Sequence, residues 1–148
     1  MKGDYAVSGL LQAALAPALI CLCYIYIRDK YEKEPVRLLV TGIVYGCYLT
    51  AVVFCFCRVL EAFTPEGRLL NILYTSFLTS AGLEELTKFV FLYFLIWRNK
   101  NFNEPFDGIV YAAFISLGYA SVENIIYILN PEIGGYNTAL SRAVFSVP

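Results

Sequence analysis

Three ionisable side chains stand inside a long apolar stretch of this chain. Within residues 80–97, only Glu84, Glu85 and Lys88 carry charge. An ionisable group at bilayer depth costs roughly 2.5–3.5 kcal/mol, so three of them together need a reason. On a helix, positions four apart share a face, which puts Glu84 beside Lys88 with Glu85 close by. A carboxylate next to a cation can take a proton from water, which is the chemistry of a general base.

The composition is that of a membrane protein. The 148 residues are 59% hydrophobic and 16% charged, with a mean hydropathy of +0.62, whereas soluble domains average about 25% charged residues. The net charge of −1 gives no basis for nucleic acid binding. We expect one transmembrane domain over residues 1–148, with the lipid bilayer as its surroundings.

The apolar stretches predict an all-α, polytopic transmembrane helical bundle of four complete spans and the start of a fifth. The complete spans are predicted at residues 5–27, 38–57, 69–97 and 108–129, and the fifth begins near Thr138. A helix of about 20 residues crosses a hydrocarbon core of about 30 Å. The third stretch is longer, so its beginning, residues 69–77, is expected to be partly interfacial. Asp107 is the expected N-cap of the fourth span.

Small residues predict where helices approach one another. The second span contains Gly42 and Gly46, four residues apart, which is typical of close helix packing. A second stripe repeats every four residues along the fourth span: Gly108, Ala112, Ser116, Ala120 and Asn124. We expect this stripe to pack tightly against a neighbouring helix.

Basic residues predict the orientation of the bundle. Six of them lie in the loops 28–37 and 98–107, against three on the opposite side. Cytoplasmic loops are enriched in Lys and Arg, so these two loops are expected in the cytoplasm and the N-terminus outside. The predicted location is the cell membrane, with a multi-pass topology.

The rise per residue of an α-helix predicts that acidic residues of the third and fourth spans lie at the same depth and meet. Glu84 lies 13 residues before Trp97, about 20 Å from the cytoplasmic boundary at 1.5 Å per residue. Glu123 lies 15 residues after Gly108, about 22 Å from the same boundary. A shared polar cavity would explain the equal depth. The candidate site therefore comprises Glu84, Glu85, Lys88, Glu123 and Asn124, with Arg142 as a further candidate.

The residues alone leave three interpretations of this site open. A glutamate could activate water for peptide hydrolysis, with Asn124 donating to the oxyanion. The acids could instead carry protons or ions, or they could only pair and fix the helix register. Zinc is not supported, because the chain has no histidine and its five cysteines, all inside predicted spans, are expected to be packing residues. We therefore predict no metal site and no cofactor.

The ordered motifs resemble those of the PrsW family of intramembrane glutamic proteases, which is related to the CAAX prenyl endopeptidases. The first is Glu84-Glu85-Leu-Thr-Lys88, and the next are Phe106-Asp107-Gly108-Ile-Val-Tyr111 and Gly118-Tyr119-Ala-Ser-Val-Glu123-Asn124. The loop Asp29-Lys-Tyr-Glu-Lys-Glu34-Pro35 and the end Arg142-Ala-Val-Phe-Ser-Val-Pro148 also resemble that family. The resemblance covers the chain from about residue 15 onward.

The resemblance implies a role for each matching residue. It assigns water activation to the Glu84–Glu85 pair and places Tyr119 and Glu123 in the second motif, with tyrosine where phenylalanine is usual. We take Tyr119 and Arg142 as candidates for binding substrate or the oxyanion. The family's third motif centres on a histidine expected beyond Pro148, so the chain is expected to be the N-terminal part of a longer protease and inactive by itself. Members are often labelled metalloproteases, so a metal-dependent mechanism stays open.

The resemblance also implies the substrate class and the alternatives. The partner would be a single-span membrane protein such as an anti-sigma factor, cleaved near the outer face in a site-1 type of cleavage. The alternative is an ion- or proton-coupled carrier, or a non-proteolytic membrane scaffold, that uses the same buried carboxylates.

Overall fold

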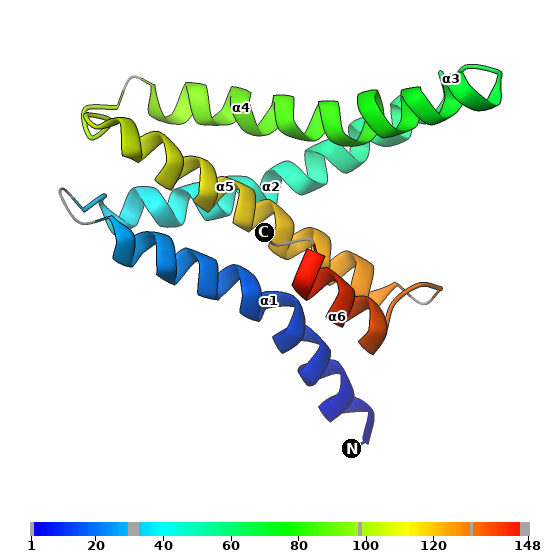
Figure 1. The fold of residues 1–148 in the computed structure, drawn as a ribbon, viewed down its shortest axis with the longest axis horizontal. Coiled ribbons are helices and arrows are strands. Elements are labelled where there is room, and N and C mark those ends of the chain that lie inside the picture. Colours follow the sequence, from blue (N-terminus) through cyan, green and yellow to red (C-terminus); the bar gives the residue numbers. More distant parts are fainter. Residues whose placement is uncertain (1, 30–32, 98, 131, 146–148) are drawn as a thin grey trace.

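The computed structural model describes residues 2–29, 33–97, 99–130 and 132–145, and it places side chains for these except at 2–7 and 80. All regular structure in these ranges is helical (Figure 1). In chain order the elements are α1 (Lys2–Arg28), α2 (Val36–Glu61), α3 (Arg68–Leu73), the π-helix η1 (Tyr74–Gly82), α4 (Leu83–Ile96), α5 (Pro105–Leu129) and α6 (Tyr136–Phe145). Lys30 and Arg98, which entered the orientation argument, and residues 146–148 lie outside the described ranges.

Three helices are long and apolar enough to cross a membrane: Ser8–Arg28 of α1, Val36–Glu61 and Pro105–Leu129. They coincide with the first, second and fourth predicted spans. The third predicted span is divided among α3, η1 and α4, and the 14 residues of α4 are too few by themselves to cross. In Figure 1 these three elements follow one another along a single rod. The start of the fifth predicted span corresponds to α6.

Close packing of α2 against α5 holds the centre of the bundle. A Cβ atom on Gly46 would lie 2.1 Å from the Ile115 carbonyl oxygen, and one on Gly118 would lie 2.4 Å from that of Ile43. Side chains bridge the same contact: Thr50 donates from its hydroxyl to the Tyr119 carbonyl at 3.3 Å. The expectation of close helix packing is therefore confirmed at Gly46, with α5 as the partner, whereas Gly42 is in ordinary contact with the same helix.

We expect Gly46→Ala to destabilise the protein and Gly42→Ala to be tolerated. The added methyl at Gly46 meets backbone atoms, which must move, whereas at Gly42 it meets the side chains of Ile115 and Phe114 at an ordinary 3.6 Å. Overpacking of this kind costs about 1–3 kcal/mol. Melting temperatures of the two variants in detergent micelles measure the difference, and equal values would contradict the close contact.

The small-residue stripe of α5 does not lie in the contact with α2. The residues of α5 that meet α2 include Ile115, Gly118 and Tyr119, whereas Ser116 and Ala120 line a cavity on another side. The stripe meets a neighbour at its far end, where the buried Asn124 bonds to α1, but Ser116 and Ala120 are only half-buried. Small side chains there leave space instead of closing it.

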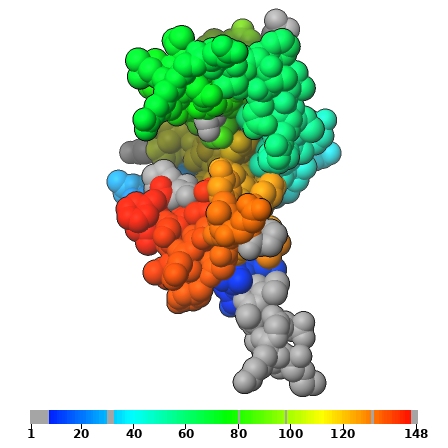
Figure 2. Space-filling model, turned by 90° about the vertical axis from the view of Figure 1, so that its right-hand side faces the viewer, coloured from blue at the N-terminus to red at the C-terminus, as the bar shows by residue number. Residues whose placement is uncertain are grey.

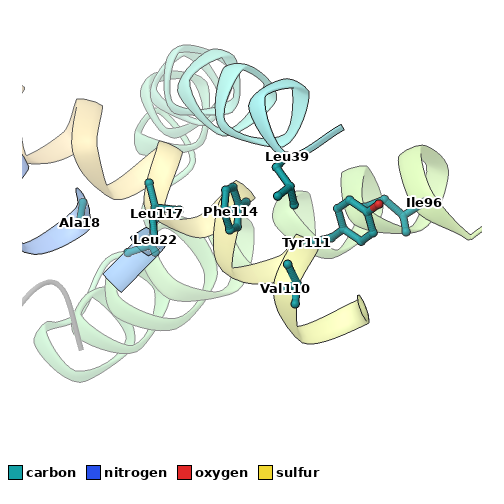
Figure 3. Packing of buried hydrophobic residues seen from close by; sticks show 8 residues of the cluster. All are labelled: Ala18, Leu22, Leu39, Ile96, Val110, Tyr111, Phe114 and Leu117. Atoms are coloured by element: carbon teal, nitrogen blue, oxygen red, sulfur yellow. The ribbon is translucent and has the colours of Figure 1, made fainter. Parts of the chain in front are cut away.

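The largest apolar cluster lies toward the loops 28–37 and 98–107. Figure 3 shows its eight buried members, contributed by α1, α2, α4 and α5: Ala18, Leu22, Leu39, Ile96, Val110, Tyr111, Phe114 and Leu117. In lipid, such side chains stabilise helix contacts through van der Waals packing. This cluster fixes the near end of α4 against α5 and so helps to set the height of the acids farther along.

A buried acidic cluster joins the first loop to the start of α5. Asp29, Glu34 and Asp107 are all buried, and the Tyr111 hydroxyl donates to the Glu34 carboxyl. Asp107 was expected to cap the helix, but the helix begins earlier, at Pro105, with Glu104 as its N-cap. Asp107 instead accepts from the backbone N–H of Glu104 at 2.8 Å. Burial first, and then the neighbouring Asp107 and Asp29, raise the pKa of Glu34, against the lowering effect of the Tyr111 bond.

We expect Glu34 to make stability depend on pH. A raised pKa means that the protonated form is favoured in the folded protein, so the stabilisation is full below the ordinary value of 4.5 and is lost as pH rises through the raised value. Glu34→Gln, which resembles the protonated acid, should remove this dependence. Melting temperatures measured from pH 4.5 upward test it, with the exposed loop residue Glu66 changed to Gln as control. Parallel curves for wild type and Glu34→Gln would contradict the prediction.

Candidate functional site

The π-helix η1 sets the direction of the acids at the start of α4. Its wider turns change the helix register immediately before Glu84, and such segments occur often at functional sites. Side-chain groups use its backbone carbonyls: the Thr79 hydroxyl donates to the Thr75 carbonyl at 2.6 Å. The Cys57 thiol of α2 donates to the Thr79 carbonyl at 3.0 Å. The sequence carries paired hydroxyls in this segment, at Thr75-Ser76 and Thr79-Ser80, and threonine hydroxyls that bond to the preceding turn often accompany a distorted helix.

The two adjacent glutamates have different surroundings. The Glu84 side chain is 25% exposed and its carboxylate lies 3.9 Å from Lys88 Nζ. The Glu85 side chain is 72% exposed and lies 2.8 Å from the same Nζ. Lys88 is therefore the shared counter-ion of the pair. Glu84 lies beside Tyr119 and Glu123 of α5, whereas Glu85 and Lys88 lie beside Ala112 and Ser116 of the same helix.

Glu84 meets the second motif across the contact between α4 and α5. The Tyr119 hydroxyl and the Glu123 carboxyl are both electrostatic neighbours of its carboxyl. Lys88 Nζ also lies over the Tyr119 ring, 4.5 Å from its centre, in a cation–π contact. The structure thus brings Glu84, Lys88, Tyr119 and Glu123 together, as the equal depth of the acids predicted.

Arg142 of α6 completes the cluster from the other side. Its Nη2 lies 3.3 Å from Glu123 Oε1, and its Nε donates to Asn124 Oδ1 at 2.8 Å. Asn124 is fully buried, and its amide N–H donates to the Ala14 carbonyl of α1 at 3.3 Å. Asn124 therefore ties α1, α5 and α6 together, and it holds the arginine that faces Glu123.

A cavity of about 450 Å³ opens onto Glu84, Tyr119 and Glu123. Its wall comes from α2, η1, α4, α5 and the turn after α5. Figure 2 looks onto this end of the molecule, where η1 and the last turns of α2 stand above the last turns of α5, with a hollow between them. The lining includes polar residues that the sequence did not point to: Thr50, Cys57, Thr75 and Thr79. Thr50 and Cys57 come from α2, and Thr75 and Thr79 come from η1, so no spacing in the sequence could have grouped all four.

The arrangement has the parts needed to hydrolyse an amide. A carboxylate in a cavity can bind water and accept its proton, and a neighbouring hydroxyl or cation can stabilise the developing oxyanion. Glu84 is the carboxylate that faces both the cavity and the second motif. Tyr119 and Lys88 are the donors nearest to it.

Comparison with known proteins points the same way. The chain is 38% identical to Protease PrsW of Geobacillus kaustophilus over 138 residues, which is 93% of this chain and 59% of that protein. It is 34% identical to Protease PrsW of Bacillus subtilis over the same length, 93% of this chain and 61% of that protein. It thus spans about three fifths of the length of these relatives. No solved structure gives a significant match.

A family model described as "PrsW family intramembrane metalloprotease" matches residues 34–148. That description implies a bound metal ion, which would need several donor side chains grouped around it. The chain has no histidine, and among the described residues no three Cys, Asp or Glu side chains are grouped to hold a metal ion. The donors described here therefore do not form such a centre by themselves. The chain is a multi-pass membrane protein that belongs to the PrsW family of intramembrane proteases.

Proposed function

We propose that the full-length protein hydrolyses a peptide bond in a single-span membrane protein, with Glu84 activating the water. The observation that supports this most directly is the meeting of Glu84, Tyr119 and Glu123 at one cavity inside the apolar bundle. Acids at this depth are costly without a function. Their place on the first and second family motifs supports the same assignment.

The proposed reaction uses side chains of the cluster in turn. The Glu84 carboxylate accepts a proton from water while the water oxygen bonds to the scissile carbonyl carbon, and the carbonyl oxygen takes the negative charge. Tyr119 donates a hydrogen bond to that oxygen, and the positive charge of Lys88 stabilises the oxyanion electrostatically. The protonated Glu84 then gives its proton to the leaving nitrogen as the C–N bond breaks, which yields a carboxylic acid and an amine.

Glu123 and Arg142 have a supporting role in this proposal. Their ion pair, with 3.3 Å between Nη2 and Oε1, holds the Glu123 carboxylate in place beside Glu84. Asn124 positions Arg142 through the bond to its Nε.

The topology proposed with this function has four spans and the start of a fifth. The third is the rod of α3, η1 and α4, whose exposed face is apolar, with Leu86, Phe89 and Phe94 all outward. The N-terminus is proposed to lie outside, which puts the cavity in the outer half of the bilayer. Cleavage would then fall near the outer face, as for an anti-sigma factor cut in a site-1 manner.

Reconstitution tests the proposal. The full-length protein is placed in liposomes with a set of tagged reporters, each with one transmembrane segment and a different sequence at its outer end. We expect at least one reporter to be cut near that end, with the bond identified by mass spectrometry of the products. If none of a broad set is cut, and proton-linked uptake is instead lost in Glu123→Gln, the protein is a carrier.

A further inference from the structure

A second cavity reaches the same acids from another side. It measures about 590 Å³ and lies among α1, α4 and α5. Glu84, Tyr119 and Glu123 line both this cavity and the first one. The three residues therefore stand where two routes meet.

The two routes differ in their chemistry. Beside apolar residues such as Val53, Phe54 and Ile126, the first has three threonine hydroxyls in its lining. It also carries the exposed ion pair Arg58–Glu61, with 3.3 Å between Nη1 and Oε2, at the last turn of α2. Hydroxyls and charges at the end of a helix suit water. Apart from its acids and Lys88, the second is lined mainly by apolar and small side chains: Cys21, Tyr24, Ile25, Ala113, Ser116, Leu117 and Ala120. This lining suits an apolar chain.

The second route opens between two helices whose backbones stay apart. Among the described residues, no Cα atom of α1 lies within 8 Å of one of α4, and each helix packs on α5, although side chains of both join the apolar cluster near the loops. Figure 1 shows them on opposite sides of α5, which forms the floor between them. Ala113, Ser116 and Ala120 lie on this floor, and their side chains are small enough to leave a cavity above them. An apolar segment lying between α1 and α4 would reach Glu84 directly.

Lys88 can bind the backbone of a substrate peptide in this cavity. Its ammonium group has three N–H donors, and the contacts to Glu85 and Glu84 at 2.8 and 3.9 Å leave one to spare. A peptide must be unwound to be cut, and an unwound peptide in lipid has carbonyls without partners. Lys88 is placed at the wall of the cavity to donate to such a carbonyl.

We propose that the unwound, apolar end of the substrate's transmembrane segment reaches Glu84 through the gap between α1 and α4, while water arrives through the cavity beside α2. This inference rests on the proposed function. In this proposal, Tyr24 and Ile25 of α1 contact the substrate. The small residues Ala113, Ser116 and Ala120 of α5 determine how large a substrate side chain can fit beside the scissile bond.

Photo-cross-linking tests the route. In full-length protein carrying Glu84→Gln, which binds without cutting, Tyr24 is replaced by photoreactive p-benzoylphenylalanine. The matched positions are Phe54, in the first cavity, and Tyr48, which is not among the residues that line either cavity. Their exposed fractions are similar, at 64%, 52% and 62%. The probe is the set of tagged single-span reporters described above.

We expect a reporter adduct at Tyr24 and none at Phe54 or Tyr48. Filling the floor with Ala113→Leu should reduce that adduct by about tenfold, while Ala51→Leu, on the exposed face of α2, should leave it unchanged. An adduct at Phe54 in place of Tyr24 would overturn the route, and so would a Tyr24 adduct formed only with lipid or with the protein's own chain. Because adducts are scored without cleavage, these results are distinct from a failure of wild-type protein to cut any reporter.

Discussion

Glu84→Gln is expected to lower the cleavage rate of the full-length protein by at least about 100-fold, since a positioned general base contributes 10²–10⁴-fold. The amide is nearly the same size and can still accept a hydrogen bond from Tyr119, but it cannot take a proton from water. The melting temperature should change little, because the side chain lines a cavity and is not packed in the core. Initial rates on a cleaved reporter in liposomes measure the effect.

The neighbouring residue gives the comparison. Glu85→Gln removes the 2.8 Å ion pair with Lys88 but leaves the carboxylate that faces Tyr119 and Glu123, so we expect a loss of no more than about tenfold, as for an exposed ion pair near a site. Glu66→Gln, in the exposed turn before α3, serves as the neutral control. A larger loss for Glu85 than for Glu84 would reassign the base. Unchanged cleavage in both would end the proposal.

The meeting of the acids on α4 and α5 could be predicted because the rise per residue of a helix is nearly constant. Counting from Trp97 to Glu84, and from Gly108 to Glu123, needed only the rise per residue and two interfacial markers. The fold class could be predicted for a related reason, since the composition admits few structures other than helices in lipid. These inferences depend on distances along single helices, which local sequence determines.

Which side of each helix contacts its neighbours could not be predicted in the same way. The π-turns of η1 change the helix register between α3 and α4, and the register decides that Glu84, not Glu85, lies beside Tyr119 and Glu123. The stripe through Ser116 and Ala120 marks one side of α5, but which neighbour covers it depends on where α1 and α4 pack. Such choices are made by tertiary contacts, and a pattern of period four is equally consistent with a tight contact and with the floor of a cavity.

The role of Asn124 shows the same limit. The sequence allowed it to donate to an oxyanion, because it follows Glu123 directly. In the structure its side chain is fully buried, with the amide oxygen bound by Arg142 Nε at 2.8 Å and the amide nitrogen bonded to the Ala14 carbonyl at 3.3 Å. Both bonds join α5 to other helices, α6 in one case and the distant α1 in the other, so they favour a positioning role.

Asn124→Ala is therefore expected to lower stability first and activity second. It removes two buried hydrogen bonds, one of them to a charged group, at a cost of roughly 1–3 kcal/mol. The melting temperature should fall clearly, and Asn101→Ala, at an exposed loop position, should leave it unchanged.

The rate per folded molecule separates the two roles of this amide. Arg142 would keep its contact to Glu123 and its place over the Tyr127 ring, 4.1 Å from the ring centre, so the fall in rate should stay within about tenfold when folded protein is counted at low temperature. Loss of an oxyanion donor would instead cost about 10²–10³ in rate. A loss of that size at an unchanged melting temperature would show that the Asn124 amide acts on the reacting carbonyl, and that its bonds to α1 and α6 are exchanged when substrate binds.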